Sequence, residues 1–165
     1  MKDVIIVQAT IDYVESYGRA VDTIAKERKY LASTEGFPIE STRSFVEMIE
    51  KQNLAQFYAV KDGSVVGWCD ILPKSFEGLR HVGNLGMGLL SEYRGKGLGS
   101  RLLERAIEHA RFKNGIEKVE LEVFESNIDA IKLYERYGFV QEGRRVKSRK
   151  LDGKYDNIIL MGKFI

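Results

Sequence analysis

The chain has 165 residues, 44% hydrophobic and 30% charged, a balance typical of a folded domain and not of a disordered chain. Its net charge of +2 provides no broad basic field for general nucleic-acid binding. The single cysteine, Cys69, excludes an intrachain disulfide and a cysteine-based zinc site. No uncharged run is long enough to span a bilayer, and Val4–Val7 is too short for a signal-peptide core. We therefore expect one cytoplasmic domain over residues 1–165, with no membrane segment and no metal.

The first third of the chain predicts a strand followed by two helices. Val4–Ala9 is an apolar run typical of a short strand, and Thr10 is a candidate cap for the helix after it. That helix is indicated by apolar residues at helical spacing, namely Val14, Tyr17, Val21 and Ile24. A loop over Ala32–Ile39 leads to a second helix from about Ser41.

The middle of the chain predicts a hairpin, a further strand and a long helix. Gln56–Val60 and Ser64–Leu72 flank Lys61-Asp62-Gly63, where glycine can supply the positive φ of a tight turn. Arg80–Leu90 mixes glycine with aliphatic residues and is interpreted as a strand. A helix with its C-terminal cap at Gly115 follows, indicated by a stripe of Leu98, Leu102, Leu103, Ala106, Ile107 and Ala110.

The last third predicts one strand, a short helix and a closing hairpin. Lys118–Phe124 alternates apolar and charged residues, as a strand does. Asn127 can cap a helix that ends at Gly138, and Phe139–Lys147 and Tyr155–Lys163 are the two final strands. The order of elements predicts an α/β fold in which helices cover a mixed sheet.

A glycine-rich turn, Arg94-Gly95-Lys96-Gly97-Leu98-Gly99, joins the strand that ends at Leu90 to the long helix. The first turn of a helix presents unpaired N–H groups and the positive end of the helix dipole. Glycines let an anion approach those groups, and Arg94 and Lys96 add positive charge. The segment therefore predicts a pyrophosphate site; the alternative is a turn that serves only tight strand–helix packing.

Two motifs identify a family to which the sequence is similar. The glycine turn matches neither the P-loop nor the Gly-x-Gly-x-x-Gly pattern, but it matches Arg/Gln-x-x-Gly-x-Gly/Ala. Asn127–Phe139 matches Asn-x-x-Ala-x-x-Leu-Tyr-x-x-x-Gly-Phe. In these motifs and in the order of elements, the sequence resembles the GNAT superfamily of acetyl-CoA-dependent N-acetyltransferases. The resemblance implies a mostly antiparallel sheet, splayed between its two middle strands, with helices on both faces.

The resemblance also implies roles for the motif residues. Backbone N–H groups of Arg94, Gly95, Lys96, Gly97, Leu98 and Gly99 would bind the pyrophosphate of coenzyme A. The backbone of Leu89 and Leu90 would pair with the pantetheine arm, and Asn127 would hydrogen-bond near it. An N–H near Leu89 would stabilise the oxyanion, and Tyr134 would protonate the departing thiolate. The alternative for Tyr134 is a core aromatic residue. Ser91 stands where many relatives have proline.

The residues that receive the amine are less clearly indicated. Glu120 and Glu122 lie on a predicted central strand, where they would either attract a cationic amine or form structural salt bridges. His81, at the start of the predicted cleft strand, and Glu35, in the loop before the second helix, are further candidates on the substrate side. Each has a structural or solvated alternative, and a water chain could replace a single base.

These observations predict acetyl transfer from acetyl-CoA to a primary amine: an amino acid, a polyamine, another small amine or a protein N-terminus. Two alternatives stay open. One is a non-catalytic module that binds or senses acetyl-CoA. The other is an RNA- or ribosome-binding module that uses the basic final hairpin, with Arg144, Arg145, Lys147, Arg149, Lys150 and Lys154. The apolar segment Ile158–Met161, expected near a sheet edge, also predicts a homodimer.

Overall fold

The computed structural model describes residues 3–165. The predicted order of strands and helices is confirmed. The elements are β1 (Ile5–Gln8), α1 (Val14–Lys26), α2 (Ile39–Lys51), β2 (Ala55–Lys61), β3 (Ser64–Pro73), β4 (Val82–Leu89), α3 (Leu98–Asn114), β5 (Lys118–Phe124), α4 (Ile128–Arg136), β6 (Val140–Leu151) and β7 (Lys154–Phe164).

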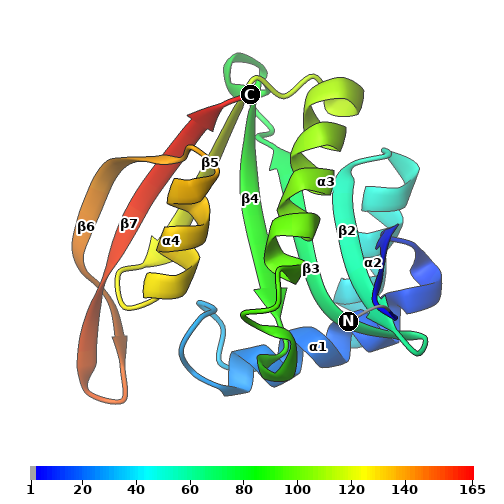
Figure 1. The fold of residues 1–165 in the computed structure, drawn as a ribbon, viewed down its shortest axis with the longest axis horizontal. Coiled ribbons are helices and arrows are strands. Elements are labelled where there is room, and N and C mark those ends of the chain that lie inside the picture. The colour runs from blue at the N-terminus through cyan, green and yellow to red at the C-terminus, as the bar shows by residue number, and fades with distance from the viewer. Residues whose placement is uncertain (1–2) are drawn as a thin grey trace.

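The strands form one seven-stranded sheet in the order β1-β2-β3-β4-β5-β7-β6. Neighbouring strands are antiparallel except β4 and β5, which are parallel. This parallel ladder is short, since it joins Val82–Asn84 to Lys118–Glu120 and then ends. Beyond it the two strands diverge (Figure 1). The mixed, mostly antiparallel sheet that splays at its centre is therefore confirmed.

The helices cover both faces of the sheet, and each face has its own hydrophobic cluster. α3 and α4 pack on one face through residues such as Leu102, Leu103 and Tyr134. α1 and α2 pack on the other face through Ile24 and Ile49, among others. The alternation of β5 follows from this arrangement, because its apolar residues Val119, Leu121 and Val123 belong to the α3/α4 cluster.

Local signals explain most element boundaries. Asp62 and Gly63 both have positive φ in the β2–β3 turn. The side chain of Asn127 accepts a hydrogen bond from the Ala130 N–H and caps α4. The cap predicted at Thr10 is wrong, because Thr10 precedes a short 3₁₀ turn, makes no side-chain cap bond, and α1 begins only at Val14.

Ile158–Met161, expected near a sheet edge, lies next to the edge strand but is not itself at a free edge. This segment lies in β7, which pairs with β5 on one side and with β6 on the other. Within residues 3–165 the edges of the sheet are β1 and β6. The homodimer stays a prediction, and this segment could contribute to it by packing but not by strand pairing.

Residues 3–165 contain no helix with the length and apolar character needed to cross a membrane.

Candidate active site

A cleft of about 970 Å³ lies where β4 and β5 diverge. Its walls are Leu85–Leu89 of β4, the glycine turn, the end of β5, one side of α4, part of β6 and the loop after α1. α4 belongs to one face of the sheet, whereas Tyr30 and Leu31 of the loop after α1 pack on the other face. The cleft therefore runs through the splay and connects the two faces of the sheet.

The free edge of β4 presents backbone groups to this cleft. The Leu90 N–H donates to the Val66 carbonyl of β3 at 2.9 Å. Because antiparallel pairing alternates along a strand, the N–H and C=O groups of Leu89 and Met87 point away from β3, toward the splay. β5 does not pair with them, so their N–H groups are free to meet an oxyanion. The Leu90 N–H is thus used within the sheet and is not available to a ligand. Met87, in contrast, is a candidate site residue that the sequence analysis missed.

Gly95 and Gly97 give the glycine turn its shape. Their φ angles are +68° and +78°, and an added Cβ would meet no atom within 4 Å at either position. These glycines are needed for a left-handed backbone and not for lack of space. The first helical bond runs from Arg101 N–H to the Gly97 carbonyl, which leaves the N–H groups of Leu98, Gly99 and Ser100 without intrahelical acceptors. This is the geometry of an anion site.

Gly99 has a different role from the other two glycines. A Cβ there would lie 3.3 Å from the Leu133 side chain of α4 and 3.5 Å from Leu89 and Met87. Gly99 therefore allows α3 to pack closely against α4 and β4. At this one position of the motif, the glycine serves tight packing, which was the alternative to an anion site.

Arg94 holds the turn in place. Its guanidinium makes a two-fold contact with the Glu27 carboxylate (2.8 and 2.5 Å), donates to the Leu89 carbonyl at 2.8 Å and lies 4.5 Å from the centre of the Tyr30 ring. The hydrogen bond to Glu27 raises the pKa of Arg94. Glu27 therefore offsets much of the positive charge that Arg94 was expected to offer an anion. The Lys96 ammonium folds back onto the Glu92 carbonyl at 2.6 Å.

Tyr134 lies in the cleft wall and is only 6% exposed. Among residues 3–165, the one fully enclosed side-chain polar atom without a partner is Oδ1 of Asn114. The Tyr134 hydroxyl, which has no hydrogen-bond partner among the same residues, is therefore open to the cleft. Burial raises the pKa of Tyr134, with a further contribution from the nearby Cys69 thiol. Cys69 lies opposite Met87 on β4, so the protonated phenol is close to the free N–H groups of that strand.

Asn127 contributes one atom to the fold and leaves another for a ligand. Its Oδ1 accepts the hydrogen bond from Ala130 N–H at 3.3 Å, and the residue lines the cleft. The side-chain NH₂ group has no acceptor among the described residues. Tyr137, which directly follows α4, instead donates a hydrogen bond from its hydroxyl to the Glu104 carboxylate at 2.5 Å.

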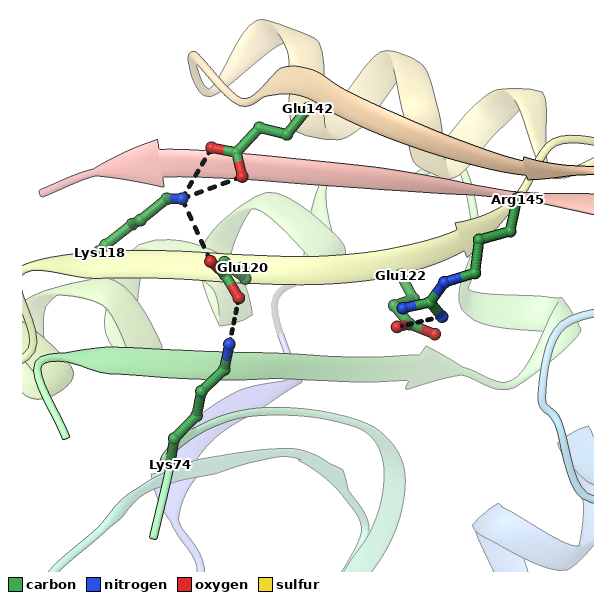
Figure 2. Close-up of polar contacts among 6 residues, drawn as sticks. All are labelled: Lys74, Lys118, Glu120, Glu122, Glu142 and Arg145. Atoms are coloured by element: carbon green, nitrogen blue, oxygen red, sulfur yellow. Dashed lines mark hydrogen bonds and ion pairs between the residues drawn. The ribbon is translucent and has the colours of Figure 1, made fainter. Parts of the chain in front are cut away.

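The candidates on the substrate side separate into two groups. Glu122 lines the cleft and pairs with Arg145 at 2.7 Å, whereas Glu120 pairs with Lys74 at 2.5 Å and Lys118 at 3.1 Å (Figure 2). The hydrogen bond from Lys74, and then that from Lys118, lowers the pKa of Glu120. Both glutamates thus form the structural salt bridges that were the alternative.

His81 and Glu35 do not belong to the residues that line the cleft. His81 is exposed just before β4, where its carbonyl accepts the N–H groups of Glu117 and Lys118. Glu35 is exposed in the loop before α2. Of the four candidates on the substrate side, only Glu122 therefore lines the cleft.

Three contacts of Arg149 and Arg28 beside the cleft could not be expected from any motif. The Arg149 guanidinium lies 4.0 Å from the centre of the Phe124 ring and donates to the Lys29 carbonyl at 2.9 Å. Arg28 makes a two-fold contact with Asp152 at the tip of the β6–β7 hairpin (3.0 and 2.8 Å). These contacts tie the hairpin to the loop after α1.

Residues 20–139 match the acetyltransferase (GNAT) family. The chain belongs to this family. It is 28% identical to the L-amino acid N-acetyltransferase AaaT of Escherichia coli strain K12 over 165 residues, which is 99% of each chain.

Two solved structures have the same fold. A GNAT-family acetyltransferase from Streptococcus pneumoniae is 27% identical with a TM-score of 0.91, covering 98% of this chain and 99% of that one. The protein yncA from Salmonella typhimurium, solved with its cofactor acetyl-CoA, is 18% identical with a TM-score of 0.90, covering 98% of this chain and 94% of that one. The family resemblance in the two sequence motifs is thereby confirmed.

Proposed function

We propose that this GNAT protein transfers the acetyl group of acetyl-CoA to a primary amine by direct attack in a ternary complex. One observation carries the proposal. A single cleft brings together free N–H groups of β4, the unpaired N–H groups at the start of α3, and an open, protonated phenol at Tyr134. These are the groups needed to hold a pyrophosphate, to stabilise an oxyanion and to protonate a leaving group.

The residues present fit acetyl-CoA as co-substrate. A volume of about 970 Å³ is at the upper end of the range for ligand pockets, roughly 300–1,000 Å³. The N–H groups from Gly95 to Ser100 would hold the pyrophosphate, and the free β4 edge at Met87 and Leu89 would pair with the pantetheine. The Asn127 NH₂ group would donate to the same arm. Bound acetyl-CoA supplies an acetyl group activated as a thioester.

The side chains and backbone of this protein then divide the chemistry. The N–H groups of Met87 and Leu89 stabilise the negative charge that develops on the carbonyl oxygen as the amine attacks. Tyr134 donates its proton to the sulfur as the C–S bond breaks. The raised pKa of Tyr134 keeps the phenol protonated at neutral pH, as an acid must be. It also makes the proton transfer uphill, so we expect a moderate contribution.

Among the amine acceptors we place amino acids first. The Escherichia coli relative named for that substrate class aligns with this protein over 99% of each chain. Polyamines, other small amines and protein N-termini are the competing classes. The acceptor would enter from the face of the loop after α1, since the α4 face is occupied by the proposed coenzyme site.

The alternative of a nucleic-acid-binding hairpin has less support. Arg144 pairs with Glu125 and Arg145 with Glu122, while Arg149 contacts Asp156 and the Lys29 carbonyl. Because these arginines are paired with carboxylates, the net positive charge available to attract phosphates is reduced. A module that only binds acetyl-CoA would not require the open hydroxyl of Tyr134.

The test is a thiol-release screen with acetyl-CoA against amino acids, polyamines, small amines and peptides, with products identified by mass spectrometry. We expect release to depend on one acceptor class and to yield an N-acetylated product. Tight acetyl-CoA binding without thiol release across the panel would favour the sensing module. Binding of a ribosomal RNA fragment that falls steeply with salt would favour the RNA module.

A further inference from the structure

Asp70 of β3 carries a carboxylate without a cation. Its one hydrogen bond is from Gln56 Nε2 to Oδ2 at 3.4 Å, and it pairs with no Lys, Arg or His among residues 3–165. Other partly buried carboxylates of the protein have cationic partners: Glu27 has Arg94 and Glu120 has two lysines. An unpaired carboxylate inside a fold is costly, and such groups concentrate at functional sites.

The surroundings of Asp70 hold it in a desolvated position on the α1 face of the sheet. Gln56 is fully buried, donates to the Tyr17 hydroxyl at 3.3 Å and accepts from the Tyr58 hydroxyl at 3.2 Å. The rings of Tyr17 and Tyr58 stack at 5.0 Å. The titratable groups that face Asp70 are thus Tyr17 of α1 and Tyr58 of β2, both with a raised pKa. Cys69, the preceding residue of the same strand, points to the opposite face and also has a raised pKa.

Within the part of the chain that the structure describes, no cation lies close enough to counteract this desolvation. Burial therefore raises the pKa of Asp70 from 3.8 to about 7, and the Gln56 hydrogen bond offsets only part of the effect. A carboxyl group that titrates there can accept a proton at neutral pH and release it again.

Asp70 does not itself line the cleft but lies directly behind a glycine that does. Gly86 of β4 is paired with Asp70 and lines the cleft. A Cβ at Gly86 would lie only 3.2 Å from Oδ1 of Asp70, so this oxygen borders the space that the missing side chain leaves. Oδ1 has no partner and is not among the fully enclosed polar atoms of the described residues. Gly86 directly precedes Met87, whose N–H faces the splay.

We propose that Asp70 is the general base that takes a proton from the acceptor ammonium, on the sheet face opposite Tyr134. The inference rests on the proposed function. The nitrogen of an ammonium loses two protons when it becomes an amide. Asp70 accepts the first, directly or through one water, which frees the lone pair that forms the C–N bond. As the C–S bond breaks, Tyr134 gives its proton to sulfur, and the second proton from nitrogen restores the phenol. Asp70 then releases its proton to solvent.

The test compares Asp70→Asn with Glu120→Gln, which removes a carboxylate from the same face but outside the cleft. In the starting protein we expect kcat to fall on the acid side of about pH 7, as Asp70 becomes protonated. Asp70→Asn should lower kcat about 10²-fold and remove this limb of the profile, because general bases contribute about 10²–10⁴-fold. The loss should shrink for an acceptor whose amine is already neutral at pH 7. Glu120→Gln should keep both the rate and the limb.

Two measurements do not depend on turnover. Carbon-13 NMR of the protein alone should show one aspartate carboxyl that titrates near pH 7 and is lost in Asp70→Asn. Calorimetry should give the same acetyl-CoA affinity for both proteins. Asp70 binds its proton more tightly when folded, so its charging lowers the free energy of unfolding from about pH 4 to about pH 7. Asp70→Asn should therefore be the more stable protein above pH 7, and lost activity with gained stability excludes misfolding.

The outcomes separate the two proposals. If the starting protein acetylates an amine, and Asp70→Asn retains its rate and its acid limb, the assignment of Asp70 is overturned while the function stands. If no amine is acetylated by the starting protein, the proposed function itself fails. A normal Asp70 pKa in the NMR titration would overturn the inference whatever the activity.

Discussion

The two ends of the cleft are built in different ways. The end proposed for the coenzyme is built mainly from backbone groups. Gly95 and Gly97 shape the turn, α3 supplies its first N–H groups, and the free edge of β4 and the Asn127 amide complete it.

The end proposed for the amine consists of side chains from distant segments. Tyr30 after α1 and Arg149 on β6 line it, and Asp70 on β3 lies behind Gly86.

This difference has a functional consequence. Backbone N–H groups recognise an anion whatever the neighbouring side chains are, so the coenzyme end can stay constant while the acceptor end changes. Side chains on loops and hairpins can be replaced without rebuilding the sheet. Arg94 connects the two ends of the cleft. It lies in the glycine turn and contacts Glu27 and Tyr30, which follow α1.

The largest effect is expected at the glycine turn. Gly97→Asp places a negative side chain on a residue with φ of +78°, beside the N–H groups that would hold the pyrophosphate. Like charges about 4 Å apart near a surface cost about 4 kcal/mol, so we expect acetyl-CoA affinity to fall about 10³-fold. Gly63→Asp is the matched control, because Gly63 has a φ of +76° and equally open space in the β2–β3 turn. Equal affinity of both variants in calorimetry would contradict the anion site.

The second effect concerns Tyr134. Tyr134→Phe removes one hydroxyl, so we expect kcat to fall by about 10²-fold, at the low end for general acids, while acetyl-CoA affinity is retained. Tyr137→Phe is the control, because its hydroxyl bonds to Glu104 away from the cleft. Steady-state kinetics with one good amine compare the two variants. A decrease in kcat of less than twofold for Tyr134→Phe, with the fold intact, would leave Tyr134 as a core aromatic residue.

The sequence could indicate the proposed coenzyme end because each of its signals lies within one short segment. The glycine turn, the Asn127 cap and Tyr134 each lie in a segment whose spacing carries the information. Asp70 could not be recognised in this way, because a single acid on an alternating strand is typical of a solvent-facing position. Only the packing of Tyr17 and Gln56 around it makes the position unusual.

Charge pairing was equally hidden from the sequence. Arg94 and Glu27 are 67 residues apart, and Arg28 and Asp152 are 124 apart. No local pattern links residues at such separations. The motif position of Arg94 therefore indicated an anion contact, whereas the folded chain gives it an internal partner.

A smaller effect is expected where the two ends are joined. Arg94 and Glu27 are 30% and 26% exposed in a two-fold contact, so each single alanine variant should be destabilised by about 2 kcal/mol. The Arg94→Ala/Glu27→Ala double variant should lose less than the sum, with a coupling of about 1–2 kcal/mol in urea unfolding. Acetyl-CoA affinity should fall about tenfold in Arg94→Ala, because the turn loses its tether to the Leu89 carbonyl. Additive losses would show that the contact does not hold the turn.

The smallest effect is expected at the mouth of the acceptor end. Arg28 and Asp152 are 44% and 63% exposed, so their ion pair should contribute less than about 1 kcal/mol to stability. The pair nevertheless ties the β6–β7 hairpin to the loop after α1, across the route proposed for the amine. Arg28→Ala should therefore raise the KM of the amine about two- to fivefold, with kcat and acetyl-CoA affinity retained, and high salt should reduce the difference. Arg105→Ala, which breaks a similarly exposed pair with Glu108 on α3, should leave the KM of the amine unchanged. An equal KM for Arg28→Ala at low salt would mean that the hairpin is held over the cleft by Arg149 alone.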